Sequence, residues 1–208
     1  HTHTLQLSIL SCGFNTQRNL DSSLESRLYL CHFPGGGKRR NNSPANASAR
    51  IVMWNTFRRL QTEGKCREIG VSNFTVAHLE QLLAETGVTP AVNQVEFHPF
   101  LFQKDLLRYC ERNNIQLEAY ASLGEGDSKL LQNSTIAKIA SNHSKTSAQI
   151  LLRWALDHKI CVIPKSVHQN RIIENFNVMD FQLSRDQMEE MNGLHQNKRF
   201  CWDPTPVS

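Results

Sequence analysis

The feature that most limits the fold of this chain is the regular alternation of strand-like and helix-like segments from Arg27 onward. The first strand-like segment, residues 28–34, is an apolar run that closes in His-Phe-Pro. Apolar runs of this kind are typical of strands that are buried on both faces of a parallel sheet. Strands that alternate with helices form βα units, in which the helices lie outside that sheet. The alternation therefore predicts an α/β fold.

About five βα units can be counted. The helix predicted at residues 51–63 carries an apolar stripe that we expect to be buried: Ile51, Met53, Trp54, Phe57 and Leu60. Thr75 can cap the next helix, which ends near Gly87. The remaining strands are expected at residues 68–72, 91–97, 115–121 and 160–164. The remaining helices are expected at residues 104–113, 136–140, 148–156, 171–175 and 186–194.

The basic residues that give the chain a net charge of +4 are spread along its length, so nucleic acid is not expected as a partner. The basic run at residues 38–40 is interpreted as a solvated loop, because polar, turn-forming residues follow it. Residues 35–38 read Gly-Gly-Gly-Lys, but Arg39 stands where a phosphate-binding loop needs Ser or Thr. This motif is therefore not interpreted as a nucleotide site.

The six cysteines show no short paired spacing. Cys31 and Cys161 lie inside strand-like runs, where we expect them to pack as small apolar groups. This usage fits a reducing, cytoplasmic compartment, and no apolar run is long enough to suggest a membrane span. His1 and His3 could share one strand face, but no third ligand lies near them in the sequence, so no metal is assigned.

Several motifs occur in the order and spacing of the aldo-keto reductases. They are Gly-Val-Ser-Asn-Phe at residues 70–74, Asn-Gln-Val-Glu-Phe-His-Pro at 93–99, Ile-Pro-Lys-Ser-Val at 163–167, and the group Arg171, Glu174, Asn175 and Phe176. The chain resembles this family from about Arg27 to the C-terminus. Residues 199–204 also resemble the closing segment of one branch of the family.

The resemblance implies a TIM (β/α)8 barrel, in which ligands lie over the C-terminal ends of the strands. A complete barrel usually needs about 250 residues, whereas this chain has 208. We therefore expect an incomplete barrel over residues 27–208, preceded by a non-family segment at residues 1–26. Five strands of such a barrel would leave edges at the His32 strand and at the last strand, which favour self-association.

Within the N-terminal segment, residues 4–10 alternate polar and apolar and predict one half-exposed strand. Residues 20–26 resemble the helix that precedes the His32 strand in the family, but the loop between that helix and the strand is missing. The foreign segment and the missing loop favour a truncated or alternatively spliced product, or an imperfect gene model, of low stability.

By resemblance the cofactor is NADP(H), and its nicotinamide end is held at strand ends. Ser72, Asn73 and Gln94 would hydrogen-bond the carboxamide, and Tyr120 would stack on the ring. The turn after Tyr120 reads Ala-Ser-Leu-Gly where the family has Ser-Pro-Leu-Gly, so a hydroxyl has moved by one position. Leu123 is the residue of this turn that we assign to the cofactor.

The phosphate end of the cofactor would lie after the last strand. Lys165 and Ser166 follow that strand, and Arg171 and Asn175 lie four apart on one helical face with Glu174 beside them. Clustered positive charge and hydrogen-bond donors suit a phosphate on C2′ of the adenosine, so the resemblance implies NADP(H) rather than NAD.

Each of these residues also has a structural interpretation. Tyr120 alone is more often a core or rim aromatic, Gln94 a polar strand end, and the pair of Arg171 and Glu174 a surface ion pair of little energetic value. Taken as a set at the correct strand ends, they favour the cofactor site. His98 and His158 match no family role, and neither does His143, so surface or packing positions are expected for all of them.

The catalytic group is the least complete part of the resemblance. In the family a hydride passes to a carbonyl carbon, a Tyr that is assisted by a Lys and an Asp protonates the oxygen, and a His orients the carbonyl. His32 matches that His, although a lone histidine is more often a core residue. Residues 1–26 contain no Tyr or Lys, and Tyr29 and Tyr109 are expected in a strand and a helix. We expect very low activity or none.

Two functions therefore stay open. The chain is either an NADP(H)-dependent aldo-keto reductase that reduces small aldehydes or ketones to alcohols, or a non-catalytic product that binds NADP(H) weakly or pairs with another chain. The cofactor motifs favour the first for the family, and the missing Tyr favours the second for this polypeptide.

Overall fold

The computed structural model of the chain describes residues 26–35 and 41–208. The predictions made for residues 1–25 and 36–40 lie outside the described residues. The described part divides into two compact units. Unit 1 comprises Glu96–Gln103 and Glu118–Trp202, and unit 2 comprises residues 26–35 and 41–95, Lys104–Leu117 and Asp203–Ser208.

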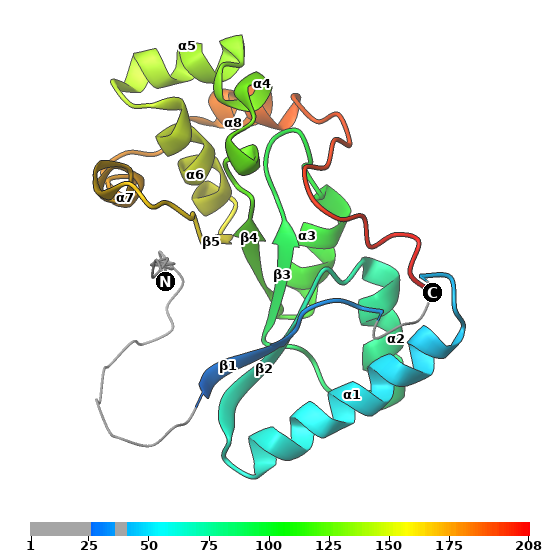
Figure 1. Cartoon of the computed structure of the whole chain (residues 1–208). Coiled ribbons are helices and arrows are strands. Elements are labelled where there is room, and N and C mark those ends of the chain that lie inside the picture. The colour runs from blue at the N-terminus through cyan, green and yellow to red at the C-terminus, as the bar shows by residue number, and fades with distance from the viewer. Residues whose placement is uncertain (1–25, 36–40) are drawn as a thin grey trace. The chain divides into compact units, whose positions relative to one another are not determined.

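The strands form one five-stranded sheet in the order β1-β2-β3-β4-β5 (Figure 1). Their bounds are Ser26–Cys31 for β1, Cys66–Ser72 for β2, Val92–Glu96 for β3, Gln116–Tyr120 for β4 and Cys161–Val162 for β5. β1 pairs with β2, β2 with β3, and β4 with β5, each in parallel. Sequential neighbours that pair in parallel and are joined by helices confirm the predicted α/β class and the βα units.

Helices follow the strands as the alternation predicted. Unit 2 contains α1 (Ala45–Thr62), α2 (Val76–Thr86) and α3 (Lys104–Arg112). Unit 1 contains α4 (Ser128–Leu131), α5 (Ser134–His143), α6 (Ser147–Asp157), α7 (Gln169–Phe176) and α8 (Arg185–Asn192), with a short 3-10 turn, η1, at Gly124–Gly126. The sequence pattern did not predict η1 or α4, because neither is long enough to show a helical period.

The helix α1 differs from its prediction in both its start and its buried face. It begins at Ala45 rather than at residue 51, after Pro44 in the helical conformation. Of the predicted apolar stripe only Trp54 is fully buried, and its other members are half-buried. The buried face also contains Asn46 and Arg50, whose polar groups broke the apolar pattern in the sequence.

The ends of α2 confirm the predicted capping. The Thr75 side chain accepts a hydrogen bond from the His78 N–H, and His78 Nδ1 accepts one from the Thr75 N–H. Gly87 ends the helix with φ +64°, a conformation that glycine adopts without strain. The tautomer of His78 follows from this cap, since Nδ1 is the acceptor and Nε2 carries the proton.

Unit 2 holds the last residues of the chain against α1 and α2. The Arg50 guanidinium, 3% exposed, donates to Pro34 O at 2.9 Å, to Ser208 O at 3.3 Å and to Gln81 Oε1. His78 Nε2 donates to Val207 O at 2.8 Å. We refer to Arg50 and His78 as the tail clamp.

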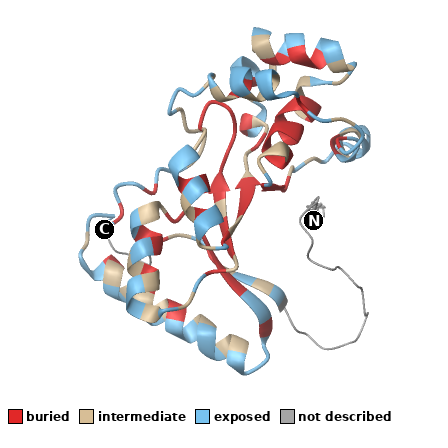
Figure 2. Ribbon diagram, turned by 180° about the vertical axis from the view of Figure 1, so that it is seen from behind, coloured by how far each residue is buried: buried red, intermediate tan, exposed pale blue. Residues whose placement is uncertain are grey.

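The core of unit 1 is built on α6. Figure 2 shows this helix as almost wholly buried, from Gln149 to Leu156. The Trp154 ring stacks on Phe97 at a centroid distance of 5.0 Å, and its Nε1–H donates to Asn192 Oδ1 at 2.9 Å. Stacked aromatic rings and a satisfied indole N–H let a large side chain pack without an unpaired donor.

The remaining histidine and cysteine predictions agree with the structure. His98 is fully buried, His143 and His158 bond Gln187 and Asn192, and so all occupy packing positions. Cys31 and Cys161 are buried, and neither forms a disulfide within the described part of the chain. Among the described residues no three metal-binding side chains cluster, and no helix is long and apolar enough to cross a bilayer.

Candidate functional site: a pocket at the strand ends of unit 1

A pocket of about 680 Å³ opens in unit 1 beside the C-terminal ends of β4 and β5. This volume is in the range of small-molecule sites. The pocket contains the predicted cofactor residues of unit 1: Tyr120, Leu123, Lys165, Ser166, Arg171, Glu174 and Asn175. The structure therefore brings these residues together, although they come from segments that are far apart in the sequence.

Tyr120 is the last residue of β4 and lies half-buried in the pocket wall. Burial raises the pKa of its phenol, and the nearby Glu96 carboxylate raises it further. The hydroxyl is therefore neutral over the physiological range. An aromatic face beside a pocket fits the predicted stacking partner, and a phenol with so high a pKa is a poor proton donor.

The turn after Tyr120 forms the next part of the wall. Ala121 adopts φ +50° and Gly124 φ +62°, so two residues take the left-handed conformation within four positions. The displaced hydroxyl, on Ser122, is buried and donates to Ala119 O at 3.2 Å. It therefore stabilises its own turn, and Leu123 and Gly126 line the pocket beside it.

Two basic residues also line the pocket. Lys165 and Arg171 are exposed, and no ion pair within the described ranges neutralises either. Ser166 lies between them in sequence and accepts a hydrogen bond from the His168 N–H. Two cations with unused hydrogen-bonding capacity at one pocket wall fit an anionic ligand such as a phosphate.

The structural alternative for Arg171 and Glu174 was a surface ion pair between them. Glu174 does not form this pair. Its Oε1 accepts a hydrogen bond from the Thr146 hydroxyl at 2.6 Å. Thr146 is also the N-cap of α6 and accepts from the Gln149 N–H. Glu174 is thus fixed by the helix cap, while Asn175 beside it is 5% exposed.

Four predicted site residues lie in unit 2. His32 follows β1, Ser72 and Asn73 lie at the end of β2, and Gln94 lies within β3. Ser72 Oγ donates to Gln94 O at 2.8 Å, and Asn73 Nδ2 donates to His32 O at 3.0 Å. Ser72 and Asn73 are 2% and 3% exposed, whereas His32 is exposed. These side chains tie neighbouring strand ends together, and their role toward the carboxamide stays a prediction.

The sequence did not single out several pocket residues. Glu125, Gly126, Leu131 and Ala148 line the pocket and belong to none of the sequence motifs. The sequence contained one signal for Glu125, since Gly124, Glu125 and Gly126 form a turn-favouring triplet shortly after the strand predicted at residues 115–121. Ala148 lines the pocket because of the way α6 packs, and no local sequence pattern predicts that packing.

Comparison with known proteins shows the family of the chain. The Aldo/keto reductase family model matches residues 24–196. Glyoxal reductase of Bacillus subtilis is 44% identical over 177 residues, which are 85% of this chain and 59% of the relative. Methylglyoxal reductase DkgA of Escherichia coli is 41% identical over 177 residues, which are 85% of this chain and 61% of the relative.

Solved structures agree with the fold. An aldo-keto reductase from a deep-sea metagenome matches with a TM-score of 0.77 at 40% identity, over 86% of this chain and 62% of its own. A Gox0644 mutant in complex with NADPH matches with a TM-score of 0.78 at 36% identity, over 89% and 65%. The chain therefore belongs to the aldo/keto reductase family, and it spans about three fifths of the length of the curated relatives it matches.

Proposed function

We propose that this chain is an NADP(H)-dependent oxidoreductase that reduces aldehydes or ketones to alcohols. The observation that carries the proposal is the pocket of unit 1, which is lined by an aromatic side chain, Tyr120, and by two exposed cations, Lys165 and Arg171. Family membership supports the reaction class. Two structural relatives are described as complexes with NADPH or NADP, which supports the nucleotide.

The pocket residues suit the two ends of such a nucleotide. Tyr120 would stack on the nicotinamide, and Lys165, Ser166 and Arg171 would hold the 2′-phosphate. Glu174, already fixed by Thr146, would accept hydrogen bonds from the adenine or ribose. When bound, NADPH supplies the hydride for carbonyl reduction, while the protein binds and orients it.

The substrate is proposed to be a small, reactive carbonyl compound. Two relatives are named glyoxal reductase and methylglyoxal reductase. His32, which is exposed at the end of β1, is the residue that would orient the carbonyl oxygen.

We propose that these 208 residues by themselves turn over slowly. Tyr29 lies in β1 and Tyr109 in α3, and the high pKa of Tyr120 makes it a weak acid. A positioned proton donor contributes about two to four decades of rate. The alternative is a chain that binds NADP(H) without catalysis. It differs from the proposed slow reductase only in having no turnover at all.

Titration with NADPH and with NADH, followed by nucleotide fluorescence, tests the nucleotide assignment. Wild type should prefer NADPH, and Arg171→Ala should weaken NADPH binding about tenfold while changing NADH binding little. Arg185→Ala is the matched control, because Arg185 is exposed and pairs with Glu189 outside the pocket. Equal affinity of wild type for both nucleotides would refute the preference.

A turnover assay with methylglyoxal tests the reaction. A rate far below about one per second is expected for the 208-residue chain. A rate at or above that value would refute the proposed loss of catalysis and would leave the reductase assignment standing.

We also propose that copies of the chain associate. β1 and β5 are the two ends of the described sheet. Side chains in and beside α7 expose apolar surface, with Ile173 54% and Phe176 55% exposed. Sedimentation velocity should show a concentration-dependent dimer that Phe176→Glu weakens, and a monomer at all concentrations would contradict this proposal.

A further inference from the structure

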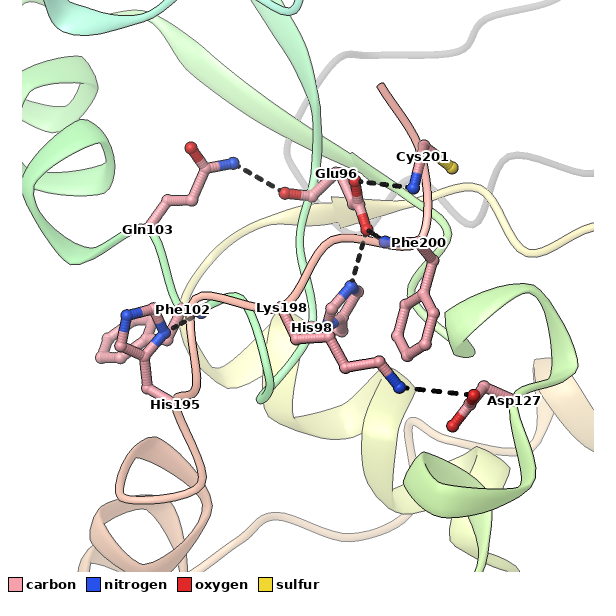
Figure 3. Close-up of polar contacts among 9 residues, drawn as sticks. All are labelled: Glu96, His98, Phe102, Gln103, Asp127, His195, Lys198, Phe200 and Cys201. Carbon is pink, nitrogen blue, oxygen red and sulfur yellow. Dashed lines mark hydrogen bonds and ion pairs between the residues drawn. The ribbon is translucent and has the colours of Figure 1, made fainter. Parts of the chain in front are cut away.

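A buried carboxylate at the end of β3 binds the segment that follows α8. Glu96 is 1% exposed, and its carboxylate accepts hydrogen bonds from His98 Nε2 at 3.0 Å, from the Phe200 N–H at 2.5 Å and from the Cys201 N–H at 3.2 Å. Figure 3 shows these donors converging on one side chain. We call this arrangement the Glu96 clasp.

The clasp uses a charge where an apolar side chain would pack at lower cost. Burial opposes ionisation of Glu96, but the hydrogen bonds from His98, Phe200 and Cys201 outweigh it and lower the pKa of the carboxyl. A buried carboxylate is therefore kept ionised by the neighbouring His98 and by two backbone N–H groups of a distant segment. Such an arrangement gives direction and register to that segment, which apolar packing does not.

Further contacts fix the same segment along its length. Phe100 O accepts from the backbone N–H groups of Gln196 and Lys198, each at 3.1 Å. Lys198 Nζ bonds Asp127 Oδ2 at 3.3 Å and lies 4.3 Å from the centre of the Phe200 ring. The ring of Phe200 is thus held between the clasp and the Lys198 side chain.

The Phe200 ring in turn supports the turn that forms the pocket wall. A Cβ placed on Gly124 would lie 2.8 Å from the Phe200 ring and 2.7 Å from Leu130, so the ring packs directly on this glycine. Gly124 stands between Leu123 and Glu125, which both line the pocket. The clasp therefore reaches the pocket through one ring and one turn, all within unit 1.

We propose that Glu96 is a positioning residue for the nucleotide pocket: its carboxylate anchors Phe200 against Gly124, and so holds the turn that carries Leu123. This inference rests on the proposed function, since it assigns Glu96 a role in nucleotide binding. Glu96 itself does not line the pocket. Its charge also acts on the Tyr120 phenol, but burial keeps that phenol neutral with or without the charge, so the effect of Glu96 on the pocket is exerted through Phe200.

The test uses the full chain and the variants Glu96→Gln, Phe200→Ala and their combination. Glu96→Gln keeps the shape of the side chain but removes the charge and places an NH2 where a backbone N–H must donate. We expect NADPH to bind about tenfold more weakly to each single variant. Because Glu96 acts through Phe200, the double variant should bind no more weakly than Phe200→Ala alone.

Asp157→Asn is the matched control. Asp157 is a nearly buried carboxylate of unit 1 that accepts from Arg153 and from the Leu183 N–H, and it does not line the pocket. The Asp157→Asn variant should be less stable than wild type but should keep the wild-type affinity for NADPH. Hydrogen exchange of the Phe200 and Cys201 amides reports on the clasp independently and should be faster in Glu96→Gln.

The outcomes are distinguishable. Faster exchange at Phe200 and Cys201 with unchanged NADPH affinity would overturn this inference and leave the proposed function intact. Losses that add in the double variant would also overturn it, because Glu96 would then act by another route. Failure of wild type to bind NADPH would overturn the proposed function and this inference together.

Discussion

The two units of the chain hold successive parts of its C-terminal segment by opposite means. In unit 1 a buried anion, Glu96, accepts hydrogen bonds from the N–H groups of Phe200 and Cys201. In unit 2 the tail clamp donates to carbonyl oxygens, with His78 bound to Val207 and Arg50 to Ser208. An extended segment offers both N–H donors and carbonyl acceptors. An acidic side chain can therefore bind its N–H groups, and a basic side chain can bind its carbonyl oxygens.

The strand ends of the two units differ in a second way. In unit 2 Ser72 and Asn73 are buried, and their side chains donate hydrogen bonds to backbone carbonyls of the neighbouring strand segments. In unit 1 Lys165 and Arg171 stay exposed beside a pocket. The side chains of unit 2 thus stabilise the sheet, whereas those of unit 1 retain charge that a ligand can use.

Arg50→Ala should have the largest effect on stability. The substitution leaves the carbonyls of Pro34 and Ser208 and the Gln81 amide oxygen without their donor. We expect a loss of about 2–4 kcal/mol in the free energy of unfolding, measured by urea denaturation. Arg59→Ala is the control on the same helix, because its ion pair with Glu63 is exposed and should contribute under about 0.5 kcal/mol. Equal losses of stability in both variants would show that the tail clamp contributes no more to stability than an exposed ion pair.

Acid should weaken the α2 cap and the Glu96 clasp at different pH values. Burial lowers the pKa of His78 from 6.5, so its stabilisation as a neutral imidazole is complete above that pH and is lost as the pH falls further. Hydrogen bonds lower the pKa of Glu96 from 4.5, so the clasp weakens only below that value. Protonation at Nδ1 removes the acceptor of the Thr75 N–H, while Nε2 still donates to Val207 O, so amide exchange at Thr75 should accelerate several-fold before exchange at Phe200 and Cys201. Simultaneous acceleration would show that one transition governs both.

Thr146→Ala should have the smallest effect, and it separates stability from binding within unit 1. Loss of the α6 cap should cost about 1 kcal/mol, and so should the matched variant Ser184→Ala, which removes the equivalent cap of α8. Of these two cap residues, Thr146 bonds Glu174, which lines the pocket, and Ser184 does not. NADPH affinity should therefore fall two- to threefold, as an order-of-magnitude figure, in Thr146→Ala alone. The same loss in Ser184→Ala would mean that the effect is one of general stability.

The sequence was sufficient for the parts of the fold that local patterns control. The strand-helix alternation predicted the parallel sheet, and Thr75 and Gly87 predicted the ends of α2. It failed where polar groups are buried by distant partners. The start of α1 was missed because the polar residues Asn46 and Arg50 occupy its buried face, and Arg50 is buried by partners as far away as Ser208.

The same distinction applies to the site. Motifs at strand ends predicted Tyr120, Lys165 and Arg171, because parallel strands end at one edge of a sheet. The Glu96 clasp was not predicted, although Glu96 and His98 stand two apart at a strand end. Its donors are backbone N–H groups more than a hundred positions away, and a backbone N–H has no signature in the sequence.

The most direct test is hydrogen exchange of the full chain with and without NADPH. The central claim is that unit 1 carries the nucleotide pocket. NADPH should therefore slow exchange at residues 120–126 and 163–175, which contain most of the residues that line that pocket. Saturable binding with protection confined to unit 2, or with no protection in these segments, would contradict the claim.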